Sequence, residues 1–121
     1  MEKYIPHKFE DISKEFLIRA NIQGKISPVF FDIGEYNYDN QREGINRQFD
    51  IVTEDENGFI SYECKYTDAP IDNSDVKEEL FQTSDLPNIH FYKLGFISKN
   101  GFADEIERDQ YNTFTLEDFY Q

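Results

Sequence analysis

The stretch FDIVTEDENGFISYECKY, residues 49–66, decides how this chain folds. Two runs of alternating apolar and polar residues flank Asn57-Gly58. Asn-Gly between such runs is the strongest short-range signal for a β-hairpin. We therefore expect a hairpin with a two-residue turn at Asn57-Gly58, and this turn sets which residues face each other.

The register of this hairpin sorts its side chains onto two faces. A turn at Asn57-Gly58 pairs Asp50 with Lys65 and Val52 with Glu63, and paired residues project to the same face. The opposite, apolar face collects Phe49, Ile51, Ile60, Tyr62, Cys64 and Tyr66. A slip of one residue would divide this apolar set between the two faces, so the apolar pattern also determines the polar one.

The polar face has the donors that a divalent cation needs. Asp50 and Glu63 become diagonal neighbours, with Cβ atoms about 5.5–8 Å apart, close enough to share Mg²⁺ at oxygen distances of about 2.0–2.1 Å. The backbone carbonyl of Cys64 could add a ligand. Lys65 would orient or deprotonate a water, or neutralise charge on a phosphate. Glu10, at the edge of an upstream helix, is the obvious further carboxylate.

A second interpretation of the same face stays open. Charged residues on one side of a hairpin are typical of a solvated surface, and Asp50 opposite Lys65 is then an ordinary cross-strand ion pair. Val52 shares this face and Phe59 could lie there too, which favours a partly covered surface.

The remaining segments complete a mixed α/β layout. The periodicity predicts, in order, a helix over 6–22, a short strand over 28–34, a surface loop over 35–47, the hairpin, a helix over 73–84, a strand over 89–98, a short helix near 102–106, an edge strand over 112–115 and a final turn capped by Thr115 and Asp118. We expect the buried helix faces to consist of Phe9, Ile12, Phe16, Leu17 and Ala20 in the first helix and Val76, Leu80 and Phe81 in the second.

Composition limits the classes of function. The 121 residues predict one domain, 1–121, and an aromatic content of 17% predicts a real core. The formal net charge of −13 repels polyanions, so any nucleic-acid affinity must come from a local basic patch, a metal ion or another chain. The single cysteine, Cys64, and the lack of an apolar leader or membrane-length run predict a cytoplasmic location without membrane contact.

Asp50 followed by Glu63-Cys64-Lys65, with a helix before and a helix after, resembles the PD-(D/E)xK nuclease superfamily. The resemblance implies a restriction-endonuclease-like αβββαβ core, with a small mixed sheet flanked by helices. One branch is closer: the nuclease-like C-terminal domain of archaeal and bacterial AAA+-type ATPases. The matching stretches are YIPHKFEDISKEFL, FDIGEYNYDN, INRQFDIV, YECKYTDAPID and GFISKNGFADEI.

The resemblance implies roles for individual residues. Asp50 and Glu63 would bind the metal, Lys65 would be the catalytic lysine, and Glu10 would be the helix-borne acid. Gln82 lies where some members place a polar helper, although an exposed helix glutamine is the simpler interpretation. The implied activity is that of an endonuclease, a hydrolase that cleaves the phosphodiester bonds of DNA with Mg²⁺, or Mn²⁺ in its place.

Two alternative functions stay open. The chain could be a catalytically silent nuclease-fold module, acting as a protein-protein or regulatory domain of an ATPase, which its acidity favours. It could also mimic DNA, although the hairpin gives no reason to prefer this. The chain starts almost at the first helix, so we expect a domain excised from a longer ATPase or a stand-alone version. The stretch 35–38 has no tryptophan, unlike relatives of this branch, so its ligand is expected to differ.

Overall fold

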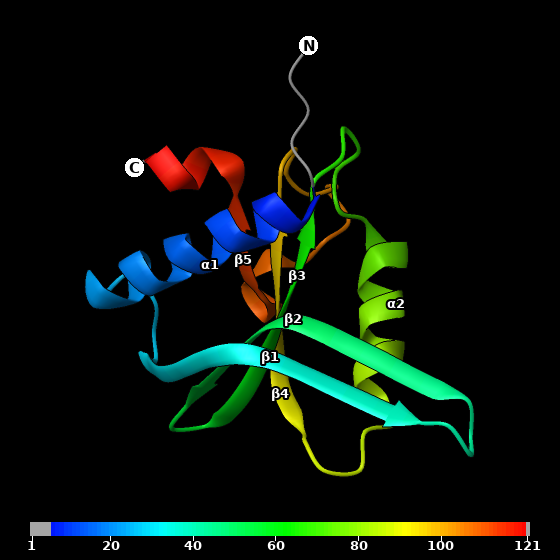
Figure 1. Ribbon diagram of the computed structural model, residues 1–121. Helices are drawn as coiled ribbons and strands as arrows, with labels where there is room; N and C mark the ends of the chain where they lie inside the picture. Colours follow the sequence, from blue (N-terminus) through cyan, green and yellow to red (C-terminus); the bar gives the residue numbers. More distant parts are fainter. Residues whose placement is uncertain (1–5, 121) are drawn as a thin grey trace.

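The computed structural model describes residues 6–120 (Figure 1). Residues 1–5 and 121, which include the start of the predicted domain and of its first family-like stretch, lie outside the described residues. The elements, in chain order, are α1 (Pro6–Ile22), β1 (Phe30–Asn40), β2 (Ile45–Asp55), β3 (Gly58–Lys65), α2 (Asn73–Ser84), β4 (Phe91–Ser98), the 3₁₀ turn η1 (Arg108–Gln110), β5 (Asn112–Thr115) and the 3₁₀ turn η2 (Leu116–Tyr120).

The strands form one five-stranded sheet in the order β1-β2-β3-β4-β5. β1, β2 and β3 are antiparallel neighbours, whereas β4 pairs in parallel with both β3 and β5. The parallel step from β3 to β4 needs a crossover, and α2 supplies it. This confirms the predicted mixed α/β class and its order of helix, three strands, helix and strand. No helix in the described part of the chain is long and apolar enough to span a membrane.

The two helices cover different cores. α1 buries the predicted face, with Ile12 partly covered, against Ile51, Tyr62 and Ile97 of the sheet. α2 begins at a capping box formed by Asp72 and Asp75. It packs beside a second cluster made of Ile71, Val76, Leu94, Phe96 and Ile106.

The buried face of α2 differs from the expectation. Leu80 and Phe81 are 49% and 65% exposed, so two of the three residues assigned to the apolar stripe point away from the core. Val76 and Glu79 are the buried residues of this helix. The prediction was wrong because apolar residues were assumed to face inward, while the inward face of α2 carries an acid.

The expected loop over 35–47 is wrong, because most of it is strand. β1 and β2 form a long antiparallel arm that turns only at Gln41–Gly44, where Gly44 adopts φ +69°. Such a left-handed conformation favours glycine. Tyr36 pairs with Phe49, and their ring centroids lie 6.4 Å apart. Alternating tyrosines therefore gave a strand signal that the surrounding polar residues obscured.

The hairpin is confirmed, but its register differs from the expected one. Asp55 pairs with Gly58 and Ile51 pairs with Tyr62, which moves the two-residue turn to Glu56-Asn57. The Asp55 carboxylate accepts the Asn57 N–H at 2.8 Å and the Tyr92 hydroxyl at 2.7 Å, and this anchors the turn. The shift is two residues, so the paired residues of this ladder, from Ile51 to Asp55 and from Gly58 to Tyr62, keep their predicted faces.

A bulge in β2 changes the face of the sheet on which the side chains before Ile51 lie. Gly34 pairs with Val52 and Tyr36 with Phe49, so β2 has one more residue than β1 in this interval. Such a bulge changes the alternation of faces. Phe49 consequently clusters with Val52 and Phe91 instead of lying with Ile51 as expected. This cluster, with Phe59 packed against it, covers part of the polar face.

The segment after β4 also differs in part. Phe102 forms a parallel bridge with Ile71 and no helix covers 102–106, because this segment uses its backbone to join the start of α2. The predicted edge strand is confirmed as β5. The Asp118 carboxylate accepts the Thr115 N–H at 2.8 Å, which confirms the capped final turn.

Candidate metal centre

The candidate site lies where β2 and β3 separate. Their ladder ends at the pair Ile51 and Tyr62, so Asp50 and Glu63 are the next residues on each strand. Beyond this point β2 follows β1 into the arm, while β3 runs parallel to β4 (Figure 1). We call this divergence, marked by Asp50 and Glu63, the fork. A fork of this kind presents two carboxylates at an opening in the sheet.

One pocket at the fork, the α1 pocket, brings Asp50 and Glu10 together. It encloses about 410 Å³ and is lined by Glu10, Asp11, Lys14, Glu35, Gln48, Asp50 and Ile51. The Gln48 amide donates to Asp50 Oδ1 at 3.0 Å and orients this carboxylate. Burial, a hydrogen bond with Asp50 and the charges of Asp50 and Glu63 raise the pKa of Glu10 to about 7, and burial is the largest cause. Glu10 therefore lies within electrostatic reach of both predicted metal-binding acids.

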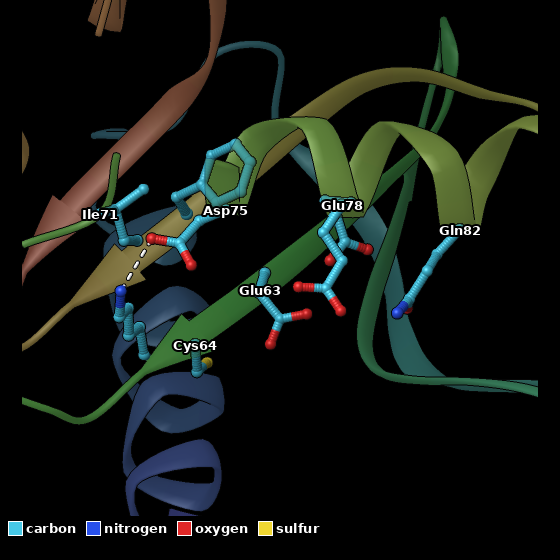
Figure 2. Close-up of a pocket in the computed structure, with 9 residues that line it drawn as sticks. Glu63, Cys64, Ile71, Asp75, Glu78 and Gln82 are labelled. Atoms are coloured by element: carbon cyan, nitrogen blue, oxygen red, sulfur yellow. Dashed lines mark hydrogen bonds and ion pairs between the residues drawn. The ribbon is translucent and has the colours of Figure 1, made fainter. Parts of the chain in front are cut away.

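The other pocket, the α2 pocket, holds Glu63. It encloses about 330 Å³ and is lined by Glu63, Cys64, Lys65, Ile71, Asp75, Glu78, Glu79, Gln82 and Phe96. Figure 2 shows the side chains of Glu63, Glu78 and Gln82 projecting into the same space between strand and helix. Gln82 is half-buried there, so the exposed-glutamine interpretation is wrong about its position.

The carboxylates in and beside the α2 pocket repel one another. Desolvation, a hydrogen bond with Glu79 and the charges of Glu79, Asp50 and Glu78 together raise the pKa of Glu63 to about 9, and desolvation is the largest cause. Solvent still reaches Glu63 from the open side of the pocket. The neighbouring carboxylates therefore favour the protonated form of Glu63.

Glu79 is the site residue that sequence reasoning missed. It is 3% exposed and faces the α2 pocket from the helix. Its position one turn after Asp75 and Val76 was the available signal, because these three residues share the inward face of α2. The signal was lost when Leu80 and Phe81 were assigned to that face.

Lys65 points to the start of α2. Its Nζ donates to Asp75 Oδ2 at 2.7 Å and to the Pro70 carbonyl at 3.4 Å. The same Asp75 oxygen accepts the Asp72 N–H at 3.0 Å, so the helix cap fixes the position of the ion pair. The cross-strand pair of Asp50 and Lys65 is therefore wrong: the observed register and the capping carboxylate give the lysine a nearer partner.

The predicted site residues are thus divided between two neighbouring pockets. Glu63, Lys65 and Cys64 line the α2 pocket, and Asp50 and Glu10 line the α1 pocket. The charge of Asp50 acts on Glu63, which couples the two groups across the fork. The Cys64 thiol packs against the α1 core, and burial raises its pKa to about 12, so the thiol stays protonated. A role for the Cys64 carbonyl stays a prediction.

The donor chemistry fits a hard divalent cation. Among the described side chains, no three His, Cys, Asp or Glu residues are arranged as a ready-made metal cage. Mg²⁺ commonly uses only one or two protein carboxylates and keeps several waters, so such a cage is not required. The crowding of Glu10, Asp50 and Glu63, two of which have raised pKa values, is the repulsion that a cation would relieve.

Comparison with known proteins places the chain in a family. Residues 1–79 match the model of DUF234, described as archaeal and bacterial proteins of unknown function. A crystal structure of a protein of unknown function, AF1548, shares the fold with a TM-score of 0.54 at 13% sequence identity, covering 86% of this chain. The chain spans 58% of the length of that protein. A search of curated proteins gave no significant match. The chain therefore belongs to the DUF234 family of archaeal and bacterial proteins.

Proposed function

We propose that this chain is a PD-(D/E)xK-type nuclease domain that hydrolyses phosphodiester bonds, with DNA as the expected substrate and Mg²⁺ or Mn²⁺ as the cofactor. The observation that carries the proposal is the fork, where Asp50 and Glu63 follow the last paired residues of β2 and β3 and the charge of Asp50 acts on Glu63. A carboxylate remote from Glu63 would not raise the pKa of Glu63 through its charge, as Asp50 does.

Asp50 and Glu63 would hold the cation, with Glu10 next to Asp50 as a further acid. When bound, a divalent cation supplies Lewis-acid stabilisation of a phosphate and lowers the pKa of a water ligand. The amide of Gln48 holds Asp50 in place. Glu10 and Glu63 would release their protons on loading, so binding should strengthen as pH rises.

Lys65 would neutralise charge on the phosphate as it develops. Its ammonium group lies in the α2 pocket beside Glu63, held by Asp75 at 2.7 Å. A bound phosphate would therefore compete with Asp75 for this lysine. Because Lys65 and Asp75 are partly exposed, this competition costs little, about 0–1 kcal/mol for such a pair.

The decisive experiment compares cleavage of supercoiled plasmid, linear DNA and RNA by the wild type, Asp50→Asn and Glu63→Gln, with Mg²⁺, Mn²⁺ or EDTA. We expect cation-dependent cleavage that falls by about 100-fold or more in both variants. Glu117→Gln, which changes an exposed glutamate outside both pockets, is the matched control. Equal cleavage by the wild type and both variants would refute the proposal.

Assay conditions matter because of the net charge of −13. An acidic chain meets DNA slowly and weakly, so the assay needs low salt and a high chain concentration. We propose that an ATPase domain or subunit supplies the missing affinity, and cleavage should be tested again once such a partner is identified.

The second candidate is a catalytically silent module that regulates an ATPase. Two observations favour it: the strongly acidic surface, and the engagement of Lys65 by Asp75 away from Asp50. Cation binding without cleavage of any nucleic acid, both alone and with an ATPase partner, would favour this module over the nuclease.

A further inference from the structure

We propose that another pocket, at the edge strand β5, binds a small aromatic phosphate. We call it the β5 pocket; it is lined by residues of α1, of β5 and of the chain segments that follow α1 and flank β5. The acids assigned to the fork line the α1 and α2 pockets instead. The inference therefore goes beyond the proposed nuclease function and does not depend on it.

The first argument is the aromatic floor of the β5 pocket. The buried Phe16 and Ala20 of α1 and the half-buried Phe114 of β5 supply its apolar atoms. The Phe16 ring meets Phe114 edge-on, with centroids 5.2 Å apart, and stacks on Phe119 at 4.6 Å. These contacts fix the rings in place, so a ligand that binds here does not have to order them.

The size of the β5 pocket limits the ligand. The pocket encloses about 350 Å³. Small-molecule pockets range from about 300 to about 1,000 Å³ and combine aromatic walls with a few polar groups that orient the ligand. A volume near the lower end of this range indicates a compact molecule, such as one substituted aromatic ring.

The second argument is that two cations without a counter-ion line the same pocket. In the part of the chain that the structure describes, neither Lys25 nor Arg108 forms an ion pair with an Asp or Glu. The Arg108 guanidinium packs on the Phe102 ring, 4.5 Å from its centroid. The chain has 25 acidic and 12 basic side chains, so acids are in excess. Two unpaired bases beside an aromatic floor therefore indicate an anionic ligand.

The third argument is that three donors suit the three oxygens of a phosphate. Arg108 Nε donates to Thr113 Oγ1 at 3.1 Å, which leaves the Nη groups of Arg108 for a ligand. The Thr113 hydroxyl accepts this bond and retains its own hydrogen to donate, and the Lys25 ammonium is the third donor. Asp118 also lines the pocket, but its Oδ2 accepts the Thr115 N–H at 2.8 Å and caps the final turn.

Plain solvation of Lys25 and Arg108 is the competing explanation, and NMR titration of the wild type separates the two. The probe is phenyl phosphate, added in EDTA so that no metal ion bridges it to the carboxylates of the fork. We expect it to shift the amide signals of Arg108, Thr113 and Phe114. It should bind about 10-fold more tightly than either inorganic phosphate or benzyl alcohol, because ring and phosphate both contribute.

Variants test the two cations separately. Lys25→Gln and Arg108→Gln should each weaken the binding of phenyl phosphate by about 5–10-fold, since each removes a hydrogen bond to a charged group. Lys77→Gln is the matched control, because it removes an exposed lysine of α2 outside this pocket, and it should leave the affinity unchanged. Equal losses in all three variants would mean general attraction of an anion and would overturn the inference.

The wild-type titration decides even if a variant fails to fold. Inorganic phosphate that binds as tightly as phenyl phosphate, shifts confined to the residues of the α2 pocket, or no saturable shift at all would each overturn the inference. None of these results bears on Asp50 and Glu63, so the proposed function would stand. Conversely, a chain that cleaves no nucleic acid but binds phenyl phosphate at β5 would support the inference and refute the nuclease.

Discussion

Replacing Asp50 with Asn should stabilise the cation-free protein at alkaline pH while weakening its response to a cation. Asp50 raises the pKa of Glu10 both through a hydrogen bond and through its charge, so the folded chain at pH 8 contains two repelling carboxylates. Asn keeps the shape of the side chain and its bond to Gln48, and its amide can donate to Glu10. The substitution should therefore remove the repulsion without creating a cavity.

The magnitude follows from the pKa of Glu10, which is raised from 4.5 to about 7. At about 1.36 kcal/mol per pKa unit, this difference corresponds to roughly 3 kcal/mol before screening. Burial, the largest cause, persists in the variant, and solvent screens a partly exposed group. We therefore expect a gain of about 1 kcal/mol at pH 8, or a rise in Tm of about 3–5 °C for a chain of this size.

Whether Asp50→Asn stabilises the protein depends on pH. The folded-state pKa of Glu10 lies above its ordinary value, so the folded chain binds more protons between these two values. The associated stability is complete below pH 4.5 and is lost as pH rises through about 7. The gain from Asp50→Asn should consequently appear at pH 8 and nearly vanish at pH 5.

The assay is thermal and urea unfolding of the wild type and Asp50→Asn at pH 5 and pH 8, in EDTA and in Mn²⁺. Asp39→Asn removes one exposed carboxylate outside both pockets and controls for the general relief of net charge. A variant that melts below the wild type at pH 8, or gains equally at both pH values, would refute the reasoning. So would an undiminished Mn²⁺-induced rise in Tm.

Three further predictions test other parts of the structure. Gly95→Ala should lower the free energy of unfolding by about 1–3 kcal/mol, because a Cβ at this position would lie 2.3 Å from the Tyr62 ring. An unchanged urea midpoint of unfolding would contradict this packing. Tyr92→Phe should lower the free energy of unfolding by about 1–3 kcal/mol, because the buried Asp55 carboxylate, 4% exposed, loses the hydroxyl that donates to it at 2.7 Å. An unchanged stability by calorimetry would contradict this hydrogen bond. Mn²⁺ should bind more tightly at pH 8 than at pH 6 and should release protons on binding, because the pKa of Glu63 is about 9. Calorimetry in buffers of different ionisation enthalpy measures this proton release, and an affinity that does not change with pH would contradict the prediction.

Local sequence was sufficient for most of the elements. The periodicity over 6–22 and 73–84 predicted α1 and α2, because this signal acts within a few residues along the chain. The misassigned loop at 35–47 and the misplaced hairpin turn had causes outside local sequence. The arm depends on pairing between distant strands, and the turn is anchored by Tyr92 from β4.

In the candidate site, too, some features followed from local sequence and others depended on contacts between distant segments. The hairpin signal was enough to place Asp50 and Glu63 near each other on adjacent strands. The bulge in β2 lies where this strand pairs with β1, and the two acids line different pockets. The partner of Lys65, the recess around Glu63 and the burial of Glu79 depend on how α2 packs over the sheet. Residue order along the chain decides how side chains alternate along an unbroken strand. Bulges, hydration and electrostatic neighbours are set by pairing and packing between distant segments, and these control proton and cation affinity.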